Sequence, residues 1–290
     1  MKILVTGING QVGFELHRSL QALGEVVAVD RAQMDLSKLQ QVRDVIRAVR
    51  PDLIVNPAAY TAVDQAENER ELAFRINGEA PAVMAEEAKK LGAGLVHFST
   101  DYVFDGSKVG PYVETDPTCP VNVYGASKLA GEQAIIAAGV PHLILRTSWV
   151  YGMRGKNFLL TVLRLAAERD QLRIVGDQFG SPTWSRTIAD TTAQLLARLD
   201  AREGLLAAMA GGQGGIYHLT ASGSTSWHGF TEQIVAHPSV ANKPQVTAIA
   251  THEYPLPARR PHNSVMAAGR LAAQGIHLPG WQSALGLCLG

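Results

Sequence analysis

Short apolar runs separated by helical patterns dominate the first 175 residues of the chain. Apolar and β-branched residues cluster in runs of strand length at 2–6, 26–29, 53–56, 94–100, 142–147 and 172–175. Such runs, with little alternation of polar residues, are typical of parallel strands that are buried on both faces. They predict a sheet in the interior of the protein.

Helical spacing of apolar residues lies between these runs. Val12, Leu16 and Leu20 follow the first run at helical spacing. Further helices are predicted from a cap at Ser37 to about residue 49, and at about 67–91, 123–138, 157–169 and 186–199, with Gly92 as a C-terminal cap. This alternation predicts an α/β fold, a doubly wound parallel sheet of the Rossmann type. Because the alternation weakens beyond Gly176, we expect residues 1–150 to form an NAD(P)-binding core, with core elements continuing to about 200. Residues 151–290 are expected to form mainly a smaller substrate lobe.

Composition excludes several classes of function. The 290 residues are 46% hydrophobic and 18% charged, as in a soluble globular protein, and 26 basic residues balance 26 acidic ones. This balance argues against a broad nucleic-acid or membrane surface. Only two cysteines occur, Cys119 and Cys288, and no apolar run is long enough to span a membrane. The apolar start of the chain is interrupted by glycines after one short strand, so no signal peptide is predicted. We therefore expect a cytoplasmic protein.

Three glycines follow the first predicted strand. Gly7, Gly10 and Gly13 suit a tight turn that brings the backbone and a helix N-terminus close to a pyrophosphate, although a glycine-rich turn without a ligand is the alternative. Asp30 ends the second strand about twenty residues later, where an acid binds the adenine ribose and favours NADH. Arg31 would favour NADPH by holding a 2′-phosphate. The preference between NADH and NADPH is left open.

Tyr124 and Lys128 lie one helical turn apart in the predicted helix after the fourth strand. A free phenol has a pKa of about 10, and a neighbouring ammonium lowers it, so the pair could exchange a proton with a carbonyl or alcohol. A hydroxyl of Ser99 or Thr100 would complete such a site. A solvated helix face is the alternative. His97 is interpreted as a core residue without a role, and Trp149 as either core or a stacking surface for a sugar.

The chain resembles the extended short-chain dehydrogenase/reductase superfamily, and within it the dTDP-4-dehydrorhamnose reductase family. The resemblance rests on the three glycines and Tyr124-Gly-x-x-Lys128, together with the segments 56–64 (NPAAYTAVD), 99–106 (STDYVFDG), 146–151 (RTSWVY), 177–183 (DQFGSPT), 217–219 (YHL) and 260–264 (RPHNS). These blocks cover nearly the whole chain in the order of the family. The resemblance implies a Rossmann-type fold and NAD(P)H-dependent reduction of the C4 keto group of dTDP-4-dehydro-L-rhamnose.

The resemblance also implies roles for individual residues. Tyr124 would donate a proton to the developing alkoxide, Lys128 would lower the tyrosine pKa and hold the nicotinamide ribose, and Thr100 would tune the pair. The cofactor would be lined by Tyr124 and Lys128 together with Gly7, Asn9, Gly10, Gln11, Val12, Gly13, Asp30, Arg31, Asp35, Leu36, Ala58, Ala59, Tyr60 and Thr61. The dTDP-linked 4-keto-6-deoxy sugar would contact Thr100, Asp101, Asn122, Trp149, Arg260 and Asn263, and the segments 177–183 and 260–264 would hold the thymidine diphosphate.

Two alternatives and one departure accompany the resemblance. An epimerase or dehydratase acting on nucleotide sugars has the same fold and Tyr/Lys pair. A non-catalytic regulatory subunit would keep the fold and bind NADP and a partner protein. Some family members bind Mg²⁺ between subunits through acidic residues. Trp184-Ser185-Arg186 places an arginine where a carboxylate would be needed, so no metal is predicted and a homodimer stays open.

Overall fold

A six-stranded parallel sheet forms the centre of the protein. The computed structural model describes residues 1–290, apart from the side chain of Glu203. The strands are β1 (Lys2–Val5), β2 (Glu25–Ala28), β3 (Leu53–Asn56), β4 (Gly94–Thr100), β5 (His142–Thr147) and β10 (Gly215–His218), in the spatial order β10-β5-β4-β3-β1-β2. Each neighbouring pair is parallel. The doubly wound parallel sheet predicted from the sequence is confirmed.

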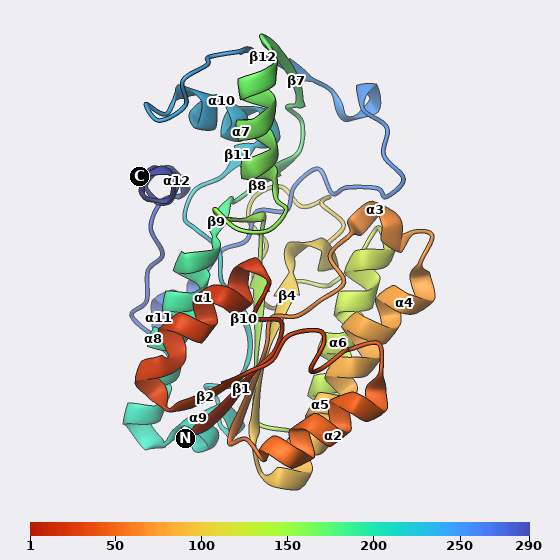
Figure 1. Ribbon diagram of the computed structural model, residues 1–290, viewed down its shortest axis with the longest axis vertical. Helices are drawn as coiled ribbons and strands as arrows, with labels where there is room; N and C mark the ends of the chain where they lie inside the picture. Colours follow the sequence, from red (N-terminus) through yellow and green to blue (C-terminus); the bar gives the residue numbers. More distant parts are fainter.

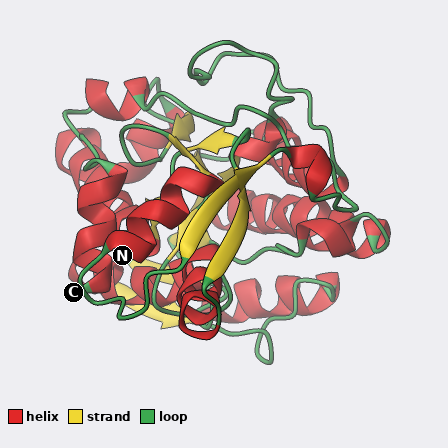
Figure 2. Cartoon of the chain, turned by 90° about the horizontal axis from the view of Figure 1, so that it is seen from above, coloured by secondary structure: helices red, strands yellow, loops and turns green.

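Helices cover both faces of this sheet (Figures 1 and 2). On one face α1 (Gln11–Ser19) packs against α8 (Ser185–Glu203), with α9 (Leu205–Ala210) and α11 (Gly269–Ala273) completing the layer. On the other face lie α2 (Leu39–Val49), α5 (Ala80–Leu91) and α6 (Val123–Ala138). The two helix layers bury the inner strands, as for Leu4 and Ile54 on the face of α2 and α5 and Leu145 on the face of α1 and α8, whereas the edge strand β2 is partly exposed. Burial on both sides explains why the strands show little alternation.

The predicted helix over residues 67–91 is wrong in its continuity. The structure has α3 (Val63–Ala66), α4 (Arg70–Phe74) and a π-helical turn, η2 (Arg75–Glu79), before α5. Asn77 in this turn lies against α6, where a Cβ at Gly131 would come within 2.2 Å of the Asn77 carbonyl oxygen. The close approach of two backbones is a tertiary constraint that a helical pattern does not reveal. Gly92 does cap α5 with a left-handed conformation, φ 68°.

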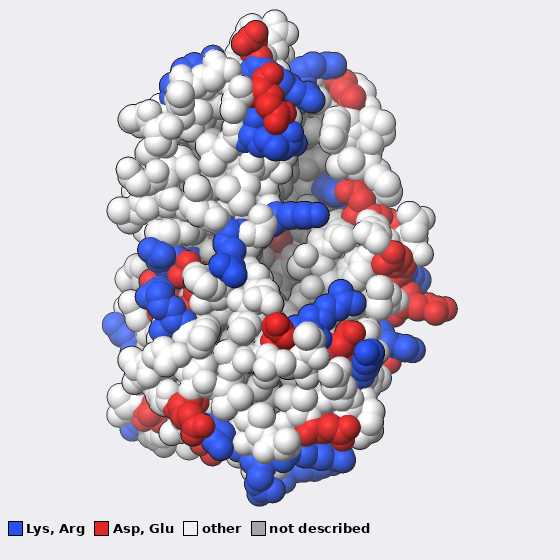
Figure 3. Space-filling model, in the orientation of Figure 1, with Lys and Arg blue, Asp and Glu red and all other residues white. Residues whose placement is uncertain are grey.

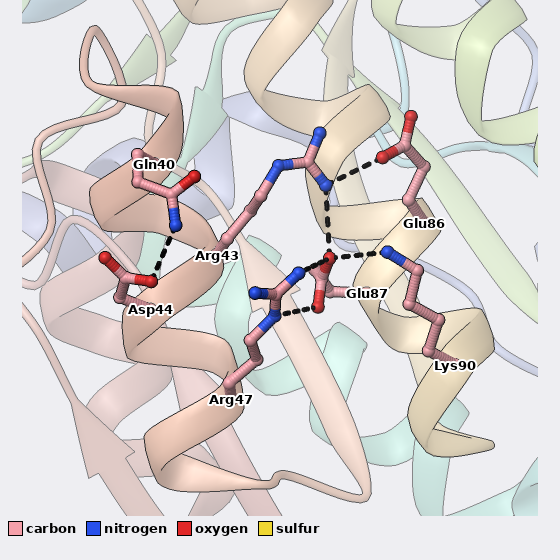
Figure 4. A network of polar contacts seen from close by, with 7 residues as sticks. All are labelled: Gln40, Arg43, Asp44, Arg47, Glu86, Glu87 and Lys90. Carbon is pink, nitrogen blue, oxygen red and sulfur yellow. Dashed lines mark hydrogen bonds and ion pairs between the residues drawn. The ribbon is translucent and has the colours of Figure 1, made fainter.

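A salt-bridge network joins α2 to α5 on the outer side of this layer (Figure 4). Glu87 of α5 is almost fully buried and accepts hydrogen bonds from Arg43 and Arg47 of α2 and from Lys90. Arg43 also pairs with the exposed Glu86. The network fixes the two helices that support β1 and β3.

A smaller layer stands above the carboxyl edge of the sheet (Figure 1). It contains the strand pairs β6 (Val150–Tyr151) with β9 (Thr183–Trp184), β7 (Gln171–Val175) with β12 (Gln245–Ile249), and β8 (Phe179–Gly180) with β11 (Thr225–Ser226). Its helices are α7 (Phe158–Glu168), α10 (Trp227–Ala236) and α12 (Trp281–Leu289). The short turns η1 (Leu20–Leu23), η3 (Asp101–Val103) and η4 (Thr251–Glu253) complete the elements. An aromatic core around Tyr151, Phe230 and Trp281 holds this layer together.

The chain returns to the central sheet after entering the smaller layer. Helix α8 packs on α1, and β10 pairs with β5 at the edge of the sheet. Residues 151–290 thus contribute to both layers, while the division of the chain by function stays a prediction. Among the described residues, no helix is long and apolar enough to cross a membrane.

Candidate active site

A cavity of about 800 Å³ lies between the sheet and the smaller layer. Figure 3 shows it as a hollow near the middle of the molecule, with Lys and Arg side chains beside it. It opens where the strand order reverses, between β1 and β3, which is the position at which doubly wound sheets bind ligands. Most predicted site residues line it: Gly7, Asn9, Gly10, Gln11, Val12, Gly13, Arg31, Asp35, Leu36, Ala58, Ala59, Thr61, Thr100, Asp101, Tyr124, Lys128 and Trp149.

The glycine turn forms one end of the cavity. Gly7 has φ 59°, and a Cβ at Gly13 would come within 2.2 Å of the Gly7 carbonyl oxygen, so both positions require glycine. Gly10 caps α1 without a side-chain hydrogen bond, which leaves the first backbone N–H groups of the helix facing the cavity. A bare helix N-terminus in a close-packed glycine turn is suited to a pyrophosphate. These residues therefore fit a dinucleotide cofactor.

The residues expected around the adenine ribose lie beside this turn. The Asn9 amide donates to Asp30 at 3.3 Å, and the Asp30 carboxylate also accepts from the backbone N–H groups of Ala32 and Gln33. Asp30 is not among the residues that line the cavity, whereas Arg31 and Asp35 are. The Arg31 guanidinium is largely exposed, and its Nε lies 3.8 Å from an Asp35 oxygen. The positions of these residues are compatible with a ribose bound by Asp30 and with a 2′-phosphate bound by Arg31.

Tyr60 faces away from the cavity although its neighbours line it. Its hydroxyl donates to Glu69 at 2.9 Å, and its backbone N–H and C=O both bind the Asn77 side chain. Burial and the Glu69 carboxylate raise the pKa of Tyr60 to about 12. Its structural contribution is to hold the loop after β3, so that Ala59 and Thr61 reach the cavity.

Tyr124 and Lys128 lie on the first turns of α6 and line the cavity together with Thr100 at the end of β4. Burial raises the pKa of the Tyr124 phenol to about 12, although a hydrogen bond with Thr100 opposes this. Burial lowers the pKa of the Lys128 amine to about 8. The expected lowering of the tyrosine pKa is therefore wrong for this geometry, because desolvation dominates. At neutral pH the phenol holds its proton and can serve as a donor.

His97 makes a contact that the sequence did not reveal. It is fully buried, as expected of a core residue, but its Nε2 lies 3.2 Å from Nζ of Lys128. Nζ also donates to the backbone carbonyl of Phe98 at 2.5 Å. The signal available in the sequence is the period of two along the strand, which places His97 and Ser99 on the face covered by α6.

Asp101 lines the cavity and accepts hydrogen bonds from Thr100 and Ser148, at 3.0 and 2.9 Å. Burial raises the pKa of this carboxyl to about 6, although hydrogen bonds from Ser264, Ser148 and Thr100 oppose the shift. The hydrogen-bond partners of this carboxylate are hydroxyl groups, and it forms no salt bridge with a described Lys or Arg side chain. It is placed to accept a hydrogen bond from a ligand hydroxyl.

Trp149 stacks face to face on Trp227, with 3.4 Å between ring centroids and 2° between planes. Trp149 has a left-handed backbone, φ 45°, which is strained for a bulky residue. Both rings line the cavity, and the Phe158 ring packs against Trp227 with 4.4 Å between centroids. Trp149 thus combines both interpretations from the sequence: it packs and it faces the cavity. Trp227 was not identified from the sequence.

Three predicted substrate residues do not line this cavity. Asn122 caps α6 by accepting from Gly125 N–H and donates to the Arg259 carbonyl. Arg260 forms a two-bonded salt bridge with Asp64, at 2.5 and 2.6 Å. The Asn263 amide donates to the carbonyl groups of Lys108 and Gly110.

The two predicted nucleotide segments do lie side by side. Phe179 N–H donates to the His262 carbonyl at 2.7 Å, and Ser264 N–H donates to the Phe179 carbonyl at 2.8 Å. A second cavity of about 360 Å³ adjoins them, lined by Gln178, Thr251, His252, Tyr254, Pro255, Leu256, Pro257, Ala258, Arg259, Arg260 and His262. The segments 177–183 and 260–264 are thereby joined into one surface.

Arg186, which stands where a metal site would need a carboxylate, pairs with Glu15. Its Nε lies 3.2 Å from a Glu15 oxygen, and Arg18 binds the same oxygen. Arg18 also pairs with Asp190 of α8. The acidic residues at this contact between α1 and α8 are therefore matched by arginines.

Comparison with known proteins agrees with this architecture. The family model described as "RmlD substrate binding domain" matches residues 1–290. A dTDP-4-dehydrorhamnose reductase of Burkholderia thailandensis is 52% identical over 296 residues, covering 100% of this chain and 98% of that protein. One from Escherichia coli K12 is 43% identical, covering 97% and 95%. A crystal structure of dTDP-4-dehydrorhamnose reductase from Bacillus anthracis in complex with NADP has a TM-score of 0.89 at 35% identity, covering 99% and 98%. The chain belongs to the dTDP-4-dehydrorhamnose reductase family.

Proposed function

We propose that the protein reduces the C4 keto group of dTDP-4-dehydro-L-rhamnose to give dTDP-L-rhamnose, using NADPH or NADH. The observation that carries this proposal is one cavity that joins the glycine turn of β1 and α1 to Tyr124, Lys128 and Thr100. A cofactor cradle and a protonated phenol in one cavity suit the addition of a hydride and a proton to a carbonyl.

The cofactor would lie along the end of the cavity formed by the glycine turn and the loops after β2 and β3. The N–H groups at the start of α1 would bind its pyrophosphate. Asp30 and Arg31, beside Asp35 and Leu36, would surround the adenine ribose. The reduced nicotinamide supplies the hydride. On this proposal residues 1–150 chiefly hold the cofactor, and residues 151–290 chiefly the nucleotide sugar.

Tyr124 would donate the proton that the developing alkoxide requires. Its raised pKa keeps the phenol protonated at neutral pH, and Thr100 lies beside it to share a hydrogen bond with the sugar oxygen. Lys128, held by the Phe98 carbonyl, would present its remaining N–H groups to the nicotinamide ribose. These roles act on the transition state, where charge develops on the oxygen.

The sugar would occupy the region between Thr100, Asp101 and the stacked Trp149. The Asp101 carboxylate is an acceptor for a sugar hydroxyl, and the indole of Trp149 offers an apolar face to a sugar ring. Arg260, Asn263 and the second cavity would take the thymidine diphosphate. Asn122 would act through the loop that carries Arg259.

The proposal is tested by supplying dTDP-4-dehydro-L-rhamnose with NADPH and NADH in parallel and following nicotinamide absorbance and the product by mass. We expect one equivalent of reduced cofactor to be oxidised per equivalent of dTDP-L-rhamnose formed. An epimerase would interconvert sugars without net oxidation of the cofactor. A non-catalytic subunit would bind NADPH without any turnover. Either result contradicts the reductase.

A further inference from the structure

A chain of buried side chains leads from the centre of the sheet to Lys128. The Thr6 hydroxyl donates to Oδ1 of Asn56 at 2.6 Å, Nδ2 of Asn56 lies 3.1 Å from Nδ1 of His97, and Nε2 of His97 lies 3.2 Å from Nζ of Lys128. The chain ends at the Phe98 carbonyl, which accepts from Nζ. Its four side chains come from neighbouring positions after β1, in β3, in β4 and on α6, and each is at most 1% exposed.

The imidazole at the middle of this chain has one donor and one acceptor. Burial and the neighbouring Lys128 hold the pKa of His97 well below its ordinary value, so the ring is neutral. A neutral ring carries its hydrogen on either Nδ1 or Nε2, but not on both. An ammonium has no lone pair, so a protonated Lys128 requires a bare Nε2 and a hydrogen on Nδ1. A neutral amine can instead accept from Nε2–H.

Asn56 and Thr6 allow the chain to run in either direction. In one direction Thr6 donates to Asn56, Nδ2 of Asn56 donates to Nδ1, and Nε2–H donates to an amine at Lys128. A half turn of the Asn56 amide exchanges its oxygen and nitrogen, so that Nδ1–H donates to the oxygen and Nε2 accepts from an ammonium. The Thr6 hydroxyl then accepts from the amide nitrogen. No link in the chain is lost in either direction.

We propose that His97 is a positioning residue, whose Nε2 holds the Lys128 amine in both of its protonation states through this reversible chain. The inference rests on the proposed function, in which Lys128 binds the nicotinamide ribose and supports Tyr124. Without His97 the Phe98 carbonyl would be the one acceptor left to hold Nζ, and the direction of the amine would be less well defined. The titratable groups around Nζ are His97 of β4 with Tyr124 and Glu132 of α6, and Glu132 is already paired with Arg146 of β5.

Two amide substitutions separate positioning from packing. In His97→Gln the side-chain amide reaches the place of Nε2 and can still accept from or donate to Lys128. In His97→Asn the shorter amide reaches only the place of Nδ1 and can bind Asn56 alone. Both variants remove the ring from the same buried site, so both should lower the thermal stability by a similar amount. Only the asparagine leaves Lys128 without its side-chain partner, with the Phe98 carbonyl as its remaining acceptor.

The experiment measures thermal unfolding, NADPH affinity by fluorescence titration, and kcat and KM with dTDP-4-dehydro-L-rhamnose from about pH 6 to about pH 10. We expect His97→Gln to keep NADPH affinity and kcat within about threefold of the wild type, and His97→Asn to lose about tenfold in both. Loss of an acceptor disfavours the ammonium, so the alkaline limb of the pH profile should move to lower pH in His97→Asn alone.

Equal behaviour of the two folded variants, in affinity and in pH profile, would overturn the inference. NADPH affinity needs no sugar, so it decides the matter even if the wild type fails to reduce this substrate. If the wild type does not reduce dTDP-4-dehydro-L-rhamnose, the proposed function fails. An NADPH affinity lower in His97→Asn than in His97→Gln would still support the positioning of Lys128. Equal NADPH affinities of the two variants would reject the positioning role of His97.

Discussion

Glu132 of α6 and Arg146 of β5 form a two-bonded ion pair, at 2.9 and 2.6 Å, in which neither side chain is more than 2% exposed. The pair lies one helical turn after Lys128, so it fixes the helix that carries the candidate catalytic residues. Nη1 of Arg146 has no further partner among the described side chains. The guanidinium therefore depends on Glu132 alone for its charge balance.

Glu132→Gln should consequently destabilise the protein by about 3–5 kcal/mol, since it leaves a buried charge without its counter-ion. Urea unfolding at neutral pH measures the loss. The matched control is Glu168→Gln, which breaks the exposed pair with Arg164 and should cost less than about 1 kcal/mol. Similar losses for the two variants would contradict the assignment of a buried ion pair to this site.

Tyr124→Phe should lower kcat by about 10²–10⁴-fold, the usual contribution of a positioned acid. NADPH affinity should stay close to that of the wild type, because the ring and its edge-to-face contact with Tyr102 remain. Steady-state kinetics and a fluorescence titration separate the two effects. Tyr217→Phe serves as the control, because it removes a hydroxyl that donates to the Gln213 carbonyl outside both cavities, and it should leave both quantities unchanged. Retained turnover in Tyr124→Phe would remove the tyrosine from the proposed mechanism.

The sequence predicted those parts of the site that depend on local geometry. The glycine turn is encoded within seven residues, and the Tyr124–Lys128 pair within one helical turn, so neither requires knowledge of the tertiary structure. The parallel sheet follows from alternating strand and helix patterns for the same reason. These elements were found where the patterns indicated, with one exception: the run at 172–175 forms β7, which pairs with β12 in the smaller layer, and the sixth strand of the central sheet is β10.

Features that depend on distant contacts could not be predicted in this way. Strand β10 has only four residues after a glycine-rich turn, and its pairing with β5 defines it. Trp227 begins α10 after an ordinary Ser226 cap, and only the packing of the smaller layer brings it onto Trp149. The contact of His97 with Lys128 likewise joins two elements that the sequence separates. In each case the sequence around one residue or strand does not indicate which distant segment it contacts.

Gly180→Ala should disturb the stacked tryptophans. A Cβ at this position would lie 2.4 Å from ring atoms of Trp149, and Trp227 blocks the movement of that ring on one face. Overpacking of this kind costs about 1–3 kcal/mol, and displacement of the ring should raise KM for the nucleotide sugar. Urea unfolding, tryptophan fluorescence and KM record the effects.

Gly286→Ala is the control for this substitution. Gly286 lies within α12, where a Cβ would meet nothing within 4 Å. Alanine is the better helix former, so stability should rise by up to about 1 kcal/mol with KM unchanged. A Gly180→Ala protein with normal fluorescence and normal KM would show that the indole pair tolerates the added methyl group.

The Glu87 network should make the contact between α2 and α5 sensitive to acid. Arg47, with Lys90 and Arg43, holds the pKa of Glu87 at about 2, below its ordinary value of 4.5. A lowered pKa in the folded state means that the carboxylate stabilises the protein above pH 4.5, and that this contribution disappears as the pH falls toward 2. Glu87→Gln should therefore be less stable than the wild type by about 1–3 kcal/mol at neutral pH, with the difference shrinking in acid.

Urea unfolding of both proteins at neutral pH and near pH 3 checks this dependence. Glu86→Gln is the matched control, because Glu86 is half exposed and pairs with Arg43 alone (Figure 4). Its loss should be within about 0.5 kcal/mol, as for most surface substitutions. A stability difference for Glu87→Gln that stays constant between the two pH values would mean that the residue acts through packing. The charge of Glu87 would then make no contribution to the stability of the contact between α2 and α5.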